Sequence, residues 1–387
     1  MKILYHHRIR SKDGQYVHLE EMVNALKNLG HEIELVGPGS VETEQFGADA
    51  GAVALLKKWM PGAGYEVLEL AYALADYRRL SAAIRRFRPD VIYERYNLYF
   101  PSGVWAKRRY GLPLLLEVNA PLFEERSRYD GIALPALARW SERYAWQGAD
   151  VVLPVTQVLA DRVVAAGVPA QRIRVIPNGI NTEAFSALPS SQDAKRRFGL
   201  EGRTVLGFVG FMRDWHGLHR VLEYMAQAPQ RDSLHALFVG DGPARAGLEK
   251  RARELGISDH VTITGVMPRD QVPEALAAFD VALQPAVVDY ASPLKLFEYL
   301  ALGLPIIAPD SPNIREVLDD GENAALFRNG DGESFISCLT RVCDDAELRA
   351  RLARGARDSI ESQGLTWRRN AERVQDLADA LRAAAEA

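Results

Sequence analysis

Residues 204–217 read TVLGFVGFMRDWHG, and this stretch indicates the fold of the protein. A short apolar run rich in β-branched residues is followed by a glycine-rich loop and then by a helical pattern. Strands that are apolar on both faces are typical of parallel sheets covered by helices on each side. The same order of strand, loop and helix recurs along the chain. The pattern therefore predicts an α/β fold with right-handed crossover connections.

Ten short runs match the strand pattern, five in each half of the chain. The expected strands of the first half are Lys2–His7, His31–Gly37, Asp90–Tyr96, Leu112–Asn119 and Asp150–Thr156. Those of the second half are Thr204–Gly210, His235–Gly240, Val261–Gly265, Val281–Pro285 and Pro305–Pro309. Helical patterns lie between them, including Leu19–Leu29, Leu74–Phe87, Leu134–Gln147 and Ala244–Leu255.

The length of 387 residues is typical of two domains. The turn Pro177-Asn178-Gly179 is a strong signal for a chain reversal, and a new strand–glycine–helix unit begins at Thr204. We therefore expect two doubly wound, Rossmann-like domains that face each other across a cleft. The expected N-terminal domain is residues 1–180 and the C-terminal domain 181–365. The last helix, residues 366–387, is expected to pack back on the N-terminal domain.

The composition excludes several classes of protein. Hydrophobic residues make up 48% of the chain and charged residues 25%, which excludes a disordered, collagen-like or disulfide-scaffold chain. No apolar run approaches the roughly 18–20 residues that span a bilayer. The start MKILYHH leads directly into a strand pattern, without a signal-peptide hydrophobic region. Cys338 and Cys343 match no zinc or redox spacing, so a reduced, cytoplasmic setting is expected.

The charge is distributed unevenly. The net charge of −4 argues against a general nucleic-acid binder. Residues 1–175 carry a net charge of +3, and residues 176–387 carry −7. Basic clusters in the first half either are solvated helix faces or contact an anionic membrane that carries a lipid-linked acceptor. These clusters are Lys57-Lys58-Trp59-Met60, Arg78-Arg79, Arg85-Arg86-Phe87-Arg88 and Lys107-Arg108-Arg109.

Three glycine-containing loops follow expected strands. They are residues 11–16 with Gly14, residues 210–217, and residues 240–243 with Gly240 and Gly242. A glycine turn before a helix N-terminus presents free backbone N–H groups and the positive end of the helix dipole, which suits phosphate. Such turns also connect strands to helices for purely structural reasons. Neither GxGxxG nor GxxxxGK[ST] occurs at these junctions, which disfavours a dinucleotide site or a P-loop.

Residues 289–305, DYASPLKLFEYLALGLP, are the most informative segment for function. Ser292 is a good N-cap, Pro293 suits the first helical position, and Gly303 can end the helix. Lys295 and Glu298 are three residues apart and therefore neighbours on the helix. They could form a surface ion pair worth about 0.2–0.5 kcal/mol. Alternatively, the lysine binds a diphosphate, and the carboxylate accepts hydrogen bonds from two ribose hydroxyls.

These elements, in this order and at these spacings, resemble the GT-B-fold glycosyltransferases of family 4, which are retaining enzymes that use nucleotide sugars. The resemblance covers nearly the whole chain. It rests on the Gly14 loop, Val175–Asn181, Val209-Gly210 with Arg213 and His216-Gly217, Val239–Pro243, Gly265–Pro268 and Ser292–Glu298.

The resemblance implies roles for residues of the C-terminal domain. Glu298 corresponds to the second glutamate of the family's E-x7-E motif and should hold the ribose, whereas Tyr290 occupies the place of the first. Arg213 and Lys295 should reach the diphosphate, and His216 stands where a lysine is usual. The donor-binding residues implied are Gly14, Gly210, His216, Gly240, Gly242, Val266, Pro268, Asp289, Tyr290, Ser292, Pro293 and Leu294. The resemblance implies no metal and no cofactor besides the donor.

In the N-terminal domain, Asn119 and Ala120 take the places of a histidine and an aspartate found in many relatives. Asn119 can bind a sugar hydroxyl but cannot act as a base. In the retaining mechanism that the resemblance implies, the departing diphosphate itself deprotonates the acceptor. The expected catalytic residues are Arg213, Lys295, Glu298 and Asn119, and the expected acceptor-side residues are Glu117, His18 and Tyr96. Glu117 and Asn119 could also be a hydrogen-bonded strand end.

The sequence therefore predicts a retaining glycosyltransferase that moves a sugar from a UDP- or GDP-sugar to a hydroxyl of a glycan, lipid-linked or small-molecule acceptor. Such an enzyme would act in glycan, polysaccharide or glycolipid biosynthesis. Two alternatives stay open, a sugar-nucleotide epimerase of the same fold and a non-catalytic subunit that binds nucleotide sugars. The sugar, the base, the acceptor and the oligomeric state do not follow from the motifs.

Overall fold

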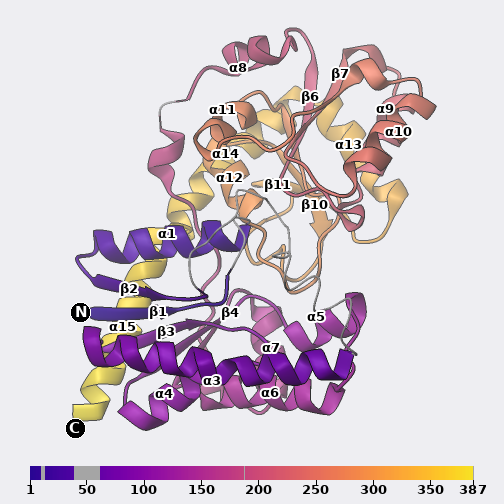
Figure 1. Ribbon diagram of the computed structural model, residues 1–387. Coiled ribbons are helices and arrows are strands. Elements are labelled where there is room, and N and C mark those ends of the chain that lie inside the picture. Colours follow the sequence, from indigo (N-terminus) through magenta and orange to yellow (C-terminus); the bar gives the residue numbers. More distant parts are fainter. Residues whose placement is uncertain (10–13, 39–61, 187, 387) are drawn as a thin grey trace. The chain divides into compact units, whose positions relative to one another are not determined.

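The computed structural model of the protein describes residues 1–9, 14–38, 62–186 and 188–386 (Figure 1). Contacts divide the chain into two compact units, each with its own parallel sheet. Unit 1 comprises Met1–Pro177, Tyr290–Ser292 and Trp367–Ala387, and unit 2 comprises Asn178–Asp289 and Pro293–Thr366.

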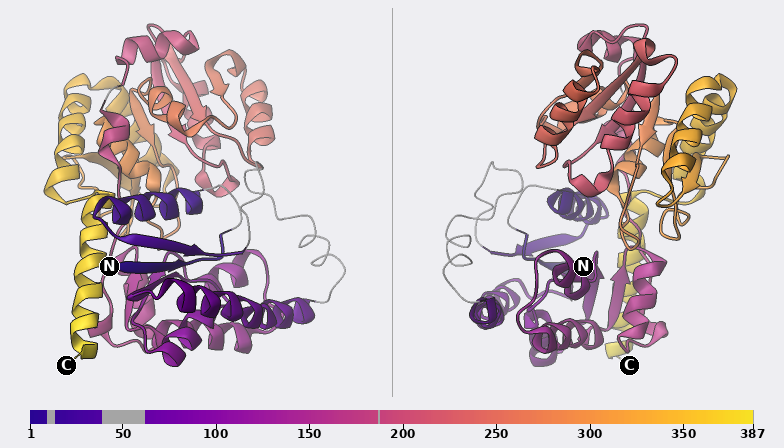
Figure 2. Two further views of the ribbon diagram at one scale, coloured as in Figure 1. Left: turned by 60° about the vertical axis from the view of Figure 1, so that its left-hand side comes forward. Right: turned by 90° about the vertical axis from the view of Figure 1, so that its right-hand side faces the viewer.

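The sheet of unit 1 is five-stranded, in the order β2-β1-β3-β4-β5, and every pairing in it is parallel. Its strands are β1 (Lys2–His6), β2 (Glu32–Val36), β3 (Val91–Arg95), β4 (Leu114–Val118) and β5 (Val151–Pro154). Helix α1 (Gly14–Asn28) lies on one side of the sheet, and α3 (Gly62–Phe87), α4 (Ser102–Tyr110) and α6 (Pro135–Gly148) lie on the other (Figures 1 and 2). The remaining helices of unit 1 are α5 (Leu122–Tyr129), α7 (Gln157–Ala165) and α15 (Trp367–Glu386).

Helix α15 joins unit 1 although it follows unit 2 in the sequence. It packs against α1. The side chain of Asn370 donates to the carbonyl of Pro177 at 2.7 Å, and Gln375 contacts the ring of His31 at 3.0 Å. The last helix is therefore part of the body that contains the N-terminal strands.

The sheet of unit 2 is six-stranded and parallel, in the order β11-β10-β9-β6-β7-β8. Its strands are β6 (Thr204–Val209), β7 (Leu234–Val239), β8 (Val261–Ile263), β9 (Val281–Leu283), β10 (Ile306–Asp310) and β11 (Ala324–Arg328). Its helices are α8 (Ser191–Phe198), α9 (His219–Gln227), α10 (Arg245–Glu254), α11 (Val272–Leu276), α12 (Leu294–Leu302), α13 (Gly332–Asp344) and α14 (Ala346–Ser362).

Side chains of β6 point alternately into two separate hydrophobic cores of unit 2. Leu206 and Phe208 join the core that contains residues of α9, α10 and α13. Val205 and Val209 join the core that contains residues of α12. Because successive side chains of a strand point to opposite faces, helices on both faces make the strand apolar throughout. This burial explains the continuous apolar pattern from which the strand was predicted.

All ten predicted strands are confirmed, with every end within two residues of that expected, but β11 was missed. Its sequence, AALFR, is short and carries no β-branched residue, so the pattern gave no signal. Helix α3 begins at Gly62 and not at Leu74. Two glycines in its first turn lower helix propensity, and apolar residues on its exposed side obscure the helical period.

A buried charged group joins three elements of unit 1. His6 at the end of β1 is fully buried, with Nδ1 2.6 Å from a Glu94 oxygen and Nε2 2.8 Å from an Asp76 oxygen. Burial alone would lower the pKa of His6, but the two carboxylates raise it to about 9. The ring is therefore a buried imidazolium that links β1 to β3 and α3.

We expect His6→Gln to destabilise unit 1 by about 3–5 kcal/mol, because it leaves the buried carboxylate of Glu94 without its cation and that of Asp76 with Arg79 alone. A histidine whose pKa is raised on folding stabilises fully below its unfolded value near 6.5 and loses that contribution as pH rises through 9. Thermal unfolding should therefore separate wild type from His6→Gln more at pH 6 than at pH 9.5. The exposed His219→Gln is the control. An equal separation at both pH values would contradict the assignment.

Candidate functional site

The carboxyl edge of the unit 2 sheet collects the loops that the sequence singled out. Strands β9, β6, β7 and β8 are neighbours and all parallel, so their carboxyl ends meet at one edge. The loop after β6, the loop after β7 and residues 264–268 after β8 follow these ends, and α12 follows β9. In open parallel sheets this edge is where ligands bind.

Gly240 and Gly242 allow two of these loops to pack backbone against backbone. Their φ angles are +131° and +155°, which L side chains rarely adopt. A Cβ at Gly240 would lie 2.3 Å from the Gly210 carbonyl oxygen, and one at Gly242 would lie 2.2 Å from that of Met212. Both glycines therefore have a structural requirement, and their predicted contact with a donor stays a prediction.

Lys295 lies in the first turn of α12 and reaches back over the end of β6. Its Nζ is 3.9 Å from the centre of the Phe208 ring, a cation–π contact. The ammonium group makes no hydrogen bond or ion pair with any residue in the described part of the chain. Burial lowers its pKa to about 7, although the charge of Glu298 opposes the shift.

Glu298 lies one turn further along α12 and is half-buried. Burial raises the pKa of its carboxyl group, and the charges of Lys295 and Arg269 oppose this. No ion pair within 4.0 Å joins it to Lys295, and no donor within the described ranges bonds to it. The ordinary surface ion pair that the spacing allowed is therefore not formed. The helix instead presents an ammonium and a carboxylate, each open to a ligand.

The loop after β6 carries the other two basic groups expected there. The Arg213 guanidinium lies over the rings of Phe211 and Trp215, at 5.2 and 4.7 Å from their centres. The Nδ1 atom of His216 accepts a hydrogen bond from the Arg213 backbone N–H at 3.2 Å. Burial, and then the charges of Lys295 and Arg213, drive the pKa of His216 far below its usual value. His216 is neutral and closes the turn, so it does not replace the charge of a lysine.

Positive charge at this edge is thus uncompensated. Lys295 and Arg213 both repel a proton from His216, and neither forms an ion pair with a described acidic residue. Lys295 is half-buried and Arg213 is exposed, and burying a cation without a partner is costly unless a ligand of opposite charge binds it. The edge is therefore a candidate anion site within the more acidic half of the chain.

The start of α12 differs from the prediction by one residue. Pro293 is the N-cap, with extended φ and ψ angles of −70° and 121°, and no side chain caps the helix. Leu294 is therefore the first helical residue, and Ser292 is not the N-cap that was expected. Gly303, with φ of +63°, ends the helix as predicted.

The remaining donor-side residues occupy several places. Val266 and Pro268, beyond β8, are exposed, and so is Asp289. Gly210 follows β6, and the Lys295 ammonium lies over it, 3.5 Å from where a Cβ would be.

Three predicted donor-side positions, Gly14, Tyr290 and Ser292, belong to unit 1. Gly14 begins α1, while residues 11–13 of its loop lie outside the described residues. Tyr290 is buried; the Thr156 hydroxyl donates to its carbonyl at 2.9 Å, and Arg162 lies 5.3 Å from its ring centre.

Glu117, at the end of β4, is only 2% exposed and accepts hydrogen bonds from several side chains. Burial would raise the pKa of its carboxyl group, but the charges of His18 and Arg95 hold it well below the usual range. Both oxygens are occupied by donors on neighbouring elements, so Glu117 has no position left for a substrate. The groups around it are Arg95, Asn119, Tyr93, Tyr5 and His18.

The structure also encloses His18 and Tyr96. His18 Nε2 lies 2.9 Å from Glu117, and its ring packs edge-on against Trp367 at 4.8 Å. The buried Tyr96 donates its hydroxyl to Glu142 at 3.0 Å. These residues pack within unit 1. Glu117, His18 and Tyr96 therefore expose no polar group for the expected contacts with an acceptor.

Asn119 is the half-buried residue of this group that keeps a free polar end. Its Nδ2 donates to Glu117. Because an ionised carboxylate only accepts hydrogen bonds, the amide nitrogen must face it. The carbonyl oxygen Oδ1 is then the end that can accept a hydrogen bond from a sugar hydroxyl.

Sequence reasoning missed the residues that hold these groups in place. Phe208 supports Lys295, Arg95 and Tyr93 saturate Glu117, and Trp367 covers His18. Strand register could have indicated Phe208 and Arg95, since each stands near the carboxyl end of a predicted strand. No signal in the sequence connects Trp367 to residues 349 positions earlier.

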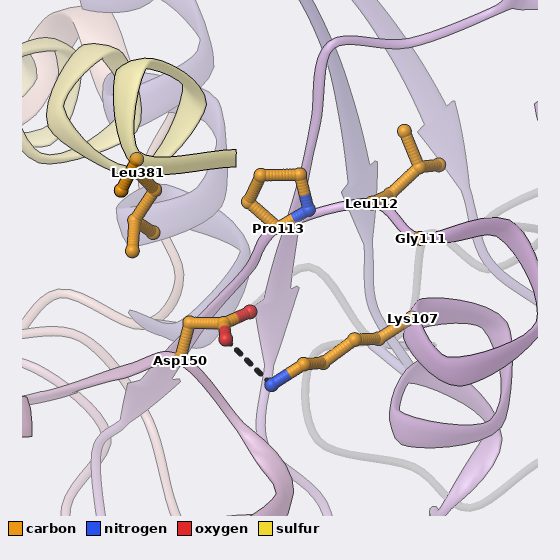
Figure 3. Close-up of a pocket in the computed structure, with 7 residues that line it drawn as sticks. Lys107, Gly111, Leu112, Pro113, Asp150 and Leu381 are labelled. Atoms are coloured by element: carbon orange, nitrogen blue, oxygen red, sulfur yellow. Dashed lines mark hydrogen bonds and ion pairs between the residues drawn. The ribbon is translucent and has the colours of Figure 1, made fainter. Parts of the chain in front are cut away.

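A pocket of about 300 Å³ lies at the opposite, amino edge of the unit 1 sheet (Figure 3). It is lined by residues that precede β4 and β5 and by Leu381 and Ala384 of α15. Its cation is already paired, since Lys107 Nζ donates to Asp150 at 2.6 Å. The pocket is therefore a packing gap of unit 1, and not the anion site.

Within the described ranges, no group of three or more His, Cys, Asp or Glu side chains is placed to hold a metal ion. No helix in the part of the chain that the structure describes is long and apolar enough to cross a membrane.

Two family models match consecutive parts of the chain. Residues 13–179 match the glycosyl transferase 4-like domain, and residues 190–359 match the glycosyl transferases group 1. The chain is 28% identical over 320 residues to a 2-deoxystreptamine glucosyltransferase of Streptomyces kanamyceticus, covering 78% of each chain. It is 25% identical to a GDP-mannose-dependent alpha-mannosyltransferase of Mycobacterium tuberculosis, over 90% of this chain and 87% of that one.

A solved structure shares the fold. The Anabaena protein Alr3699/HepE, crystallised with UDP-glucose, superposes with a TM-score of 0.72 over 98% of this chain and 100% of that one, at 19% identity. The two matched family models, the two parallel-sheet units and the shared fold lead to one assignment. The chain belongs to the GT-B-fold glycosyltransferases of the group 1 type.

Proposed function

We propose that the enzyme is a retaining glycosyltransferase that moves a sugar from a UDP- or GDP-sugar to a hydroxyl of a glycan, a lipid-linked glycan or a small molecule. The observation that carries this proposal is the pair of open groups on α12. Lys295 has no anion among the described residues, and Glu298, one turn away, has no donor. A nucleotide sugar supplies both, a diphosphate for the lysine and a ribose diol for the carboxylate.

Each donor contact follows from the chemistry of the group that makes it. Lys295 and Arg213 hold the diphosphate, with the N-terminal N–H groups of α12 directed to the same anion. The carboxylate of Glu298 accepts from the two ribose hydroxyls. The exposed backbone at 266–268 contacts the edge of the base.

The chemical step is a displacement on one face of the donor sugar. The bond from the anomeric carbon to the diphosphate oxygen breaks as the bond to the acceptor oxygen forms, and the acceptor proton passes to the departing diphosphate. Lys295 and Arg213 stabilise the charge that develops on this leaving group. Asn119 accepts a hydrogen bond from a sugar hydroxyl and positions it, without acting as a base.

The named relatives support a hexosyl donor but differ in the base. One is named for GDP-mannose, and the Anabaena protein was crystallised with UDP-glucose. UDP-sugars and GDP-sugars are therefore both candidate donors. The role is in glycan, polysaccharide or glycolipid biosynthesis.

We expect Glu298→Ala to lower kcat/KM for the donor by about tenfold to hundredfold, because a carboxylate loses its hydrogen bonds to the ribose. The fold should persist, since Glu298 supports no other described side chain. Glu361→Ala, an exposed carboxylate of α14, is the matched control. Transfer and donor hydrolysis are measured with the preferred sugar nucleotide. If Glu298→Ala turned over the donor at the wild-type rate, Glu298 would not be the residue that binds the ribose.

The preferred donor should raise the thermal unfolding midpoint, because a ligand that binds the folded state stabilises it. A panel of UDP- and GDP-sugars should therefore give a shift with one base and little with the other. Lys295→Ala should lose the shift, while its midpoint without donor stays near that of wild type. A donor shift that survives Lys295→Ala would remove the lysine from the diphosphate site.

Donor affinity should depend on pH through Lys295. Its pKa is near 7 in the empty site, and a bound diphosphate raises it. Binding above pH 7 must therefore take up a proton, and Kd should rise about tenfold per pH unit between pH 7 and the raised pKa. Lys295→Arg should bind with a flat pH profile over this range, because the guanidinium stays protonated. The same slope in Lys295→Arg would assign it to another group.

A further inference from the structure

The acidic side chains of α3 all turn toward the interior of unit 1. Glu66 accepts two backbone N–H groups at 2.6 and 2.9 Å, Glu69 pairs with Arg126 at 2.9 Å, and Asp76 holds His6. A helix on a protein surface normally places its charged side chains outward and its apolar ones inward. In α3 the three carboxylates occupy the inward side, so its outward side must be composed of other residues.

The outward side of α3 is apolar in its first half and basic in its second. Val67, Leu68 and Leu74 are 53%, 45% and 59% exposed; Val67 and Leu74 lie seven residues apart on one stripe of the helix, and Leu68 follows Val67. Arg78 and Arg85 continue the stripe and are exposed. The exposed surface of this helix therefore combines large apolar side chains with cations and carries no acidic side chain.

Helices α4 and α6 repeat this arrangement. The only acidic residue of α6, Glu142, is buried and bonded to Tyr96, while Trp140 is 47% exposed between the exposed Arg139 and Arg143. Helix α4 has no acidic residue and exposes Arg108 and Arg109. Inward carboxylates and exposed arginines thus occur together on α3 and α6, and α4 exposes arginines without any carboxylate.

These three helices lie on the same side of the unit 1 sheet (Figures 1 and 2). Together they expose seven arginines, of which Arg86 pairs with Glu34, and no carboxylate. By contrast, α7 exposes Asp161, and α15 exposes Asp376 and Asp379. The segregation belongs to one face of unit 1. We name the outward sides of α3, α4 and α6 the basic face.

We propose that the basic face docks the enzyme on an anionic lipid bilayer, with the arginines at headgroup phosphates and the apolar side chains in the interface. Arginines near an anionic surface each add to the attraction. Aliphatic and tryptophan side chains gain by entering the boundary between headgroups and acyl chains. A nucleic acid would pair with the arginines, but it would gain nothing from contact with the exposed apolar side chains of Val67, Leu68 and Leu74. This proposal extends beyond the sugar-transfer function and does not depend on the donor site.

Vesicle co-sedimentation tests the proposal with the full chain. Vesicles of phosphatidylcholine alone are compared with vesicles that also contain phosphatidylglycerol. We expect at least about tenfold tighter binding to the anionic vesicles, weakened by added salt. Equal binding to both vesicle types, or binding to neither, would overturn the proposal.

Charge reversal on the basic face is compared with the same reversal elsewhere. The variant Arg78→Glu, Arg109→Glu, Arg143→Glu should lose anionic-vesicle binding at least tenfold. The control variant Arg172→Glu, Arg253→Glu, Arg354→Glu changes the net charge equally at exposed positions outside the basic face. It should bind the vesicles within a few-fold of wild type. Equal losses in both variants would show that net charge, and not this face, drives binding.

A variant that loses two apolar side chains of the basic face, here called the apolar variant, distinguishes a bilayer from other partners. Leu68→Ser with Leu74→Ser should weaken vesicle binding while its dependence on salt is retained. If wild type instead forms a dimer that this variant disperses, the face binds a second copy of the chain and the proposal is wrong. Duplex DNA that displaces the vesicles, with no effect of the apolar variant, would also overturn it. All these variants should keep wild-type turnover on a soluble acceptor, which distinguishes this result from failure of the donor site.

Discussion

A charge that leaves water must be balanced, and this constraint organises both units. In unit 1 it is met internally. His6 lies between two carboxylates, and Glu117 contacts an arginine, a histidine and hydroxyl and amide donors from β1, β3, α1 and the residue after β4. In unit 2 the constraint is not met at the carboxyl edge of the sheet, where Lys295 has only the face of Phe208. The paired charges of unit 1 stabilise the fold, whereas the charge of Lys295 is available to a ligand.

The parallel order of the strands determines where the open charge lies. Because β9, β6, β7 and β8 are adjacent and parallel, four connections leave the sheet at the same edge. Gly240 and Gly242 let two of these loops approach at backbone distance, so the edge stays compact beside the first turn of α12. Burial lowers the pKa values of both Lys295 and His216, and the charges of Lys295 and Arg213 add to the shift at His216. A bound anion raises the pKa of Lys295 and so increases the positive charge of the site.

Most of the fold, and the helix that carries Lys295 and Glu298, could be predicted from the sequence, because both depend on local patterns. Apolar runs marked the strands, and the spacing of Lys295 and Glu298 placed them on one helix face. The failures involve tertiary contacts. Glu117 and His18 looked available, but Arg95, Tyr93 and Trp367, distant in sequence, enclose them. The early start of α3 was hidden because the exposed side of that helix is apolar, which reverses the usual pattern.

The return of α15 to unit 1 has a consequence for the order in which the protein can fold. Residues 178–366, except 290–292, form unit 2, and they are synthesised before Trp367. The ring of Trp367 packs on His18, beside the ion pair of His18 with Glu117, and Asn370 bonds the carbonyl of Pro177. Domains generally fold as units during synthesis, with the N-terminal one first. Here unit 1 cannot be completed until residues 367–386 have left the ribosome, which is after unit 2 has been synthesised.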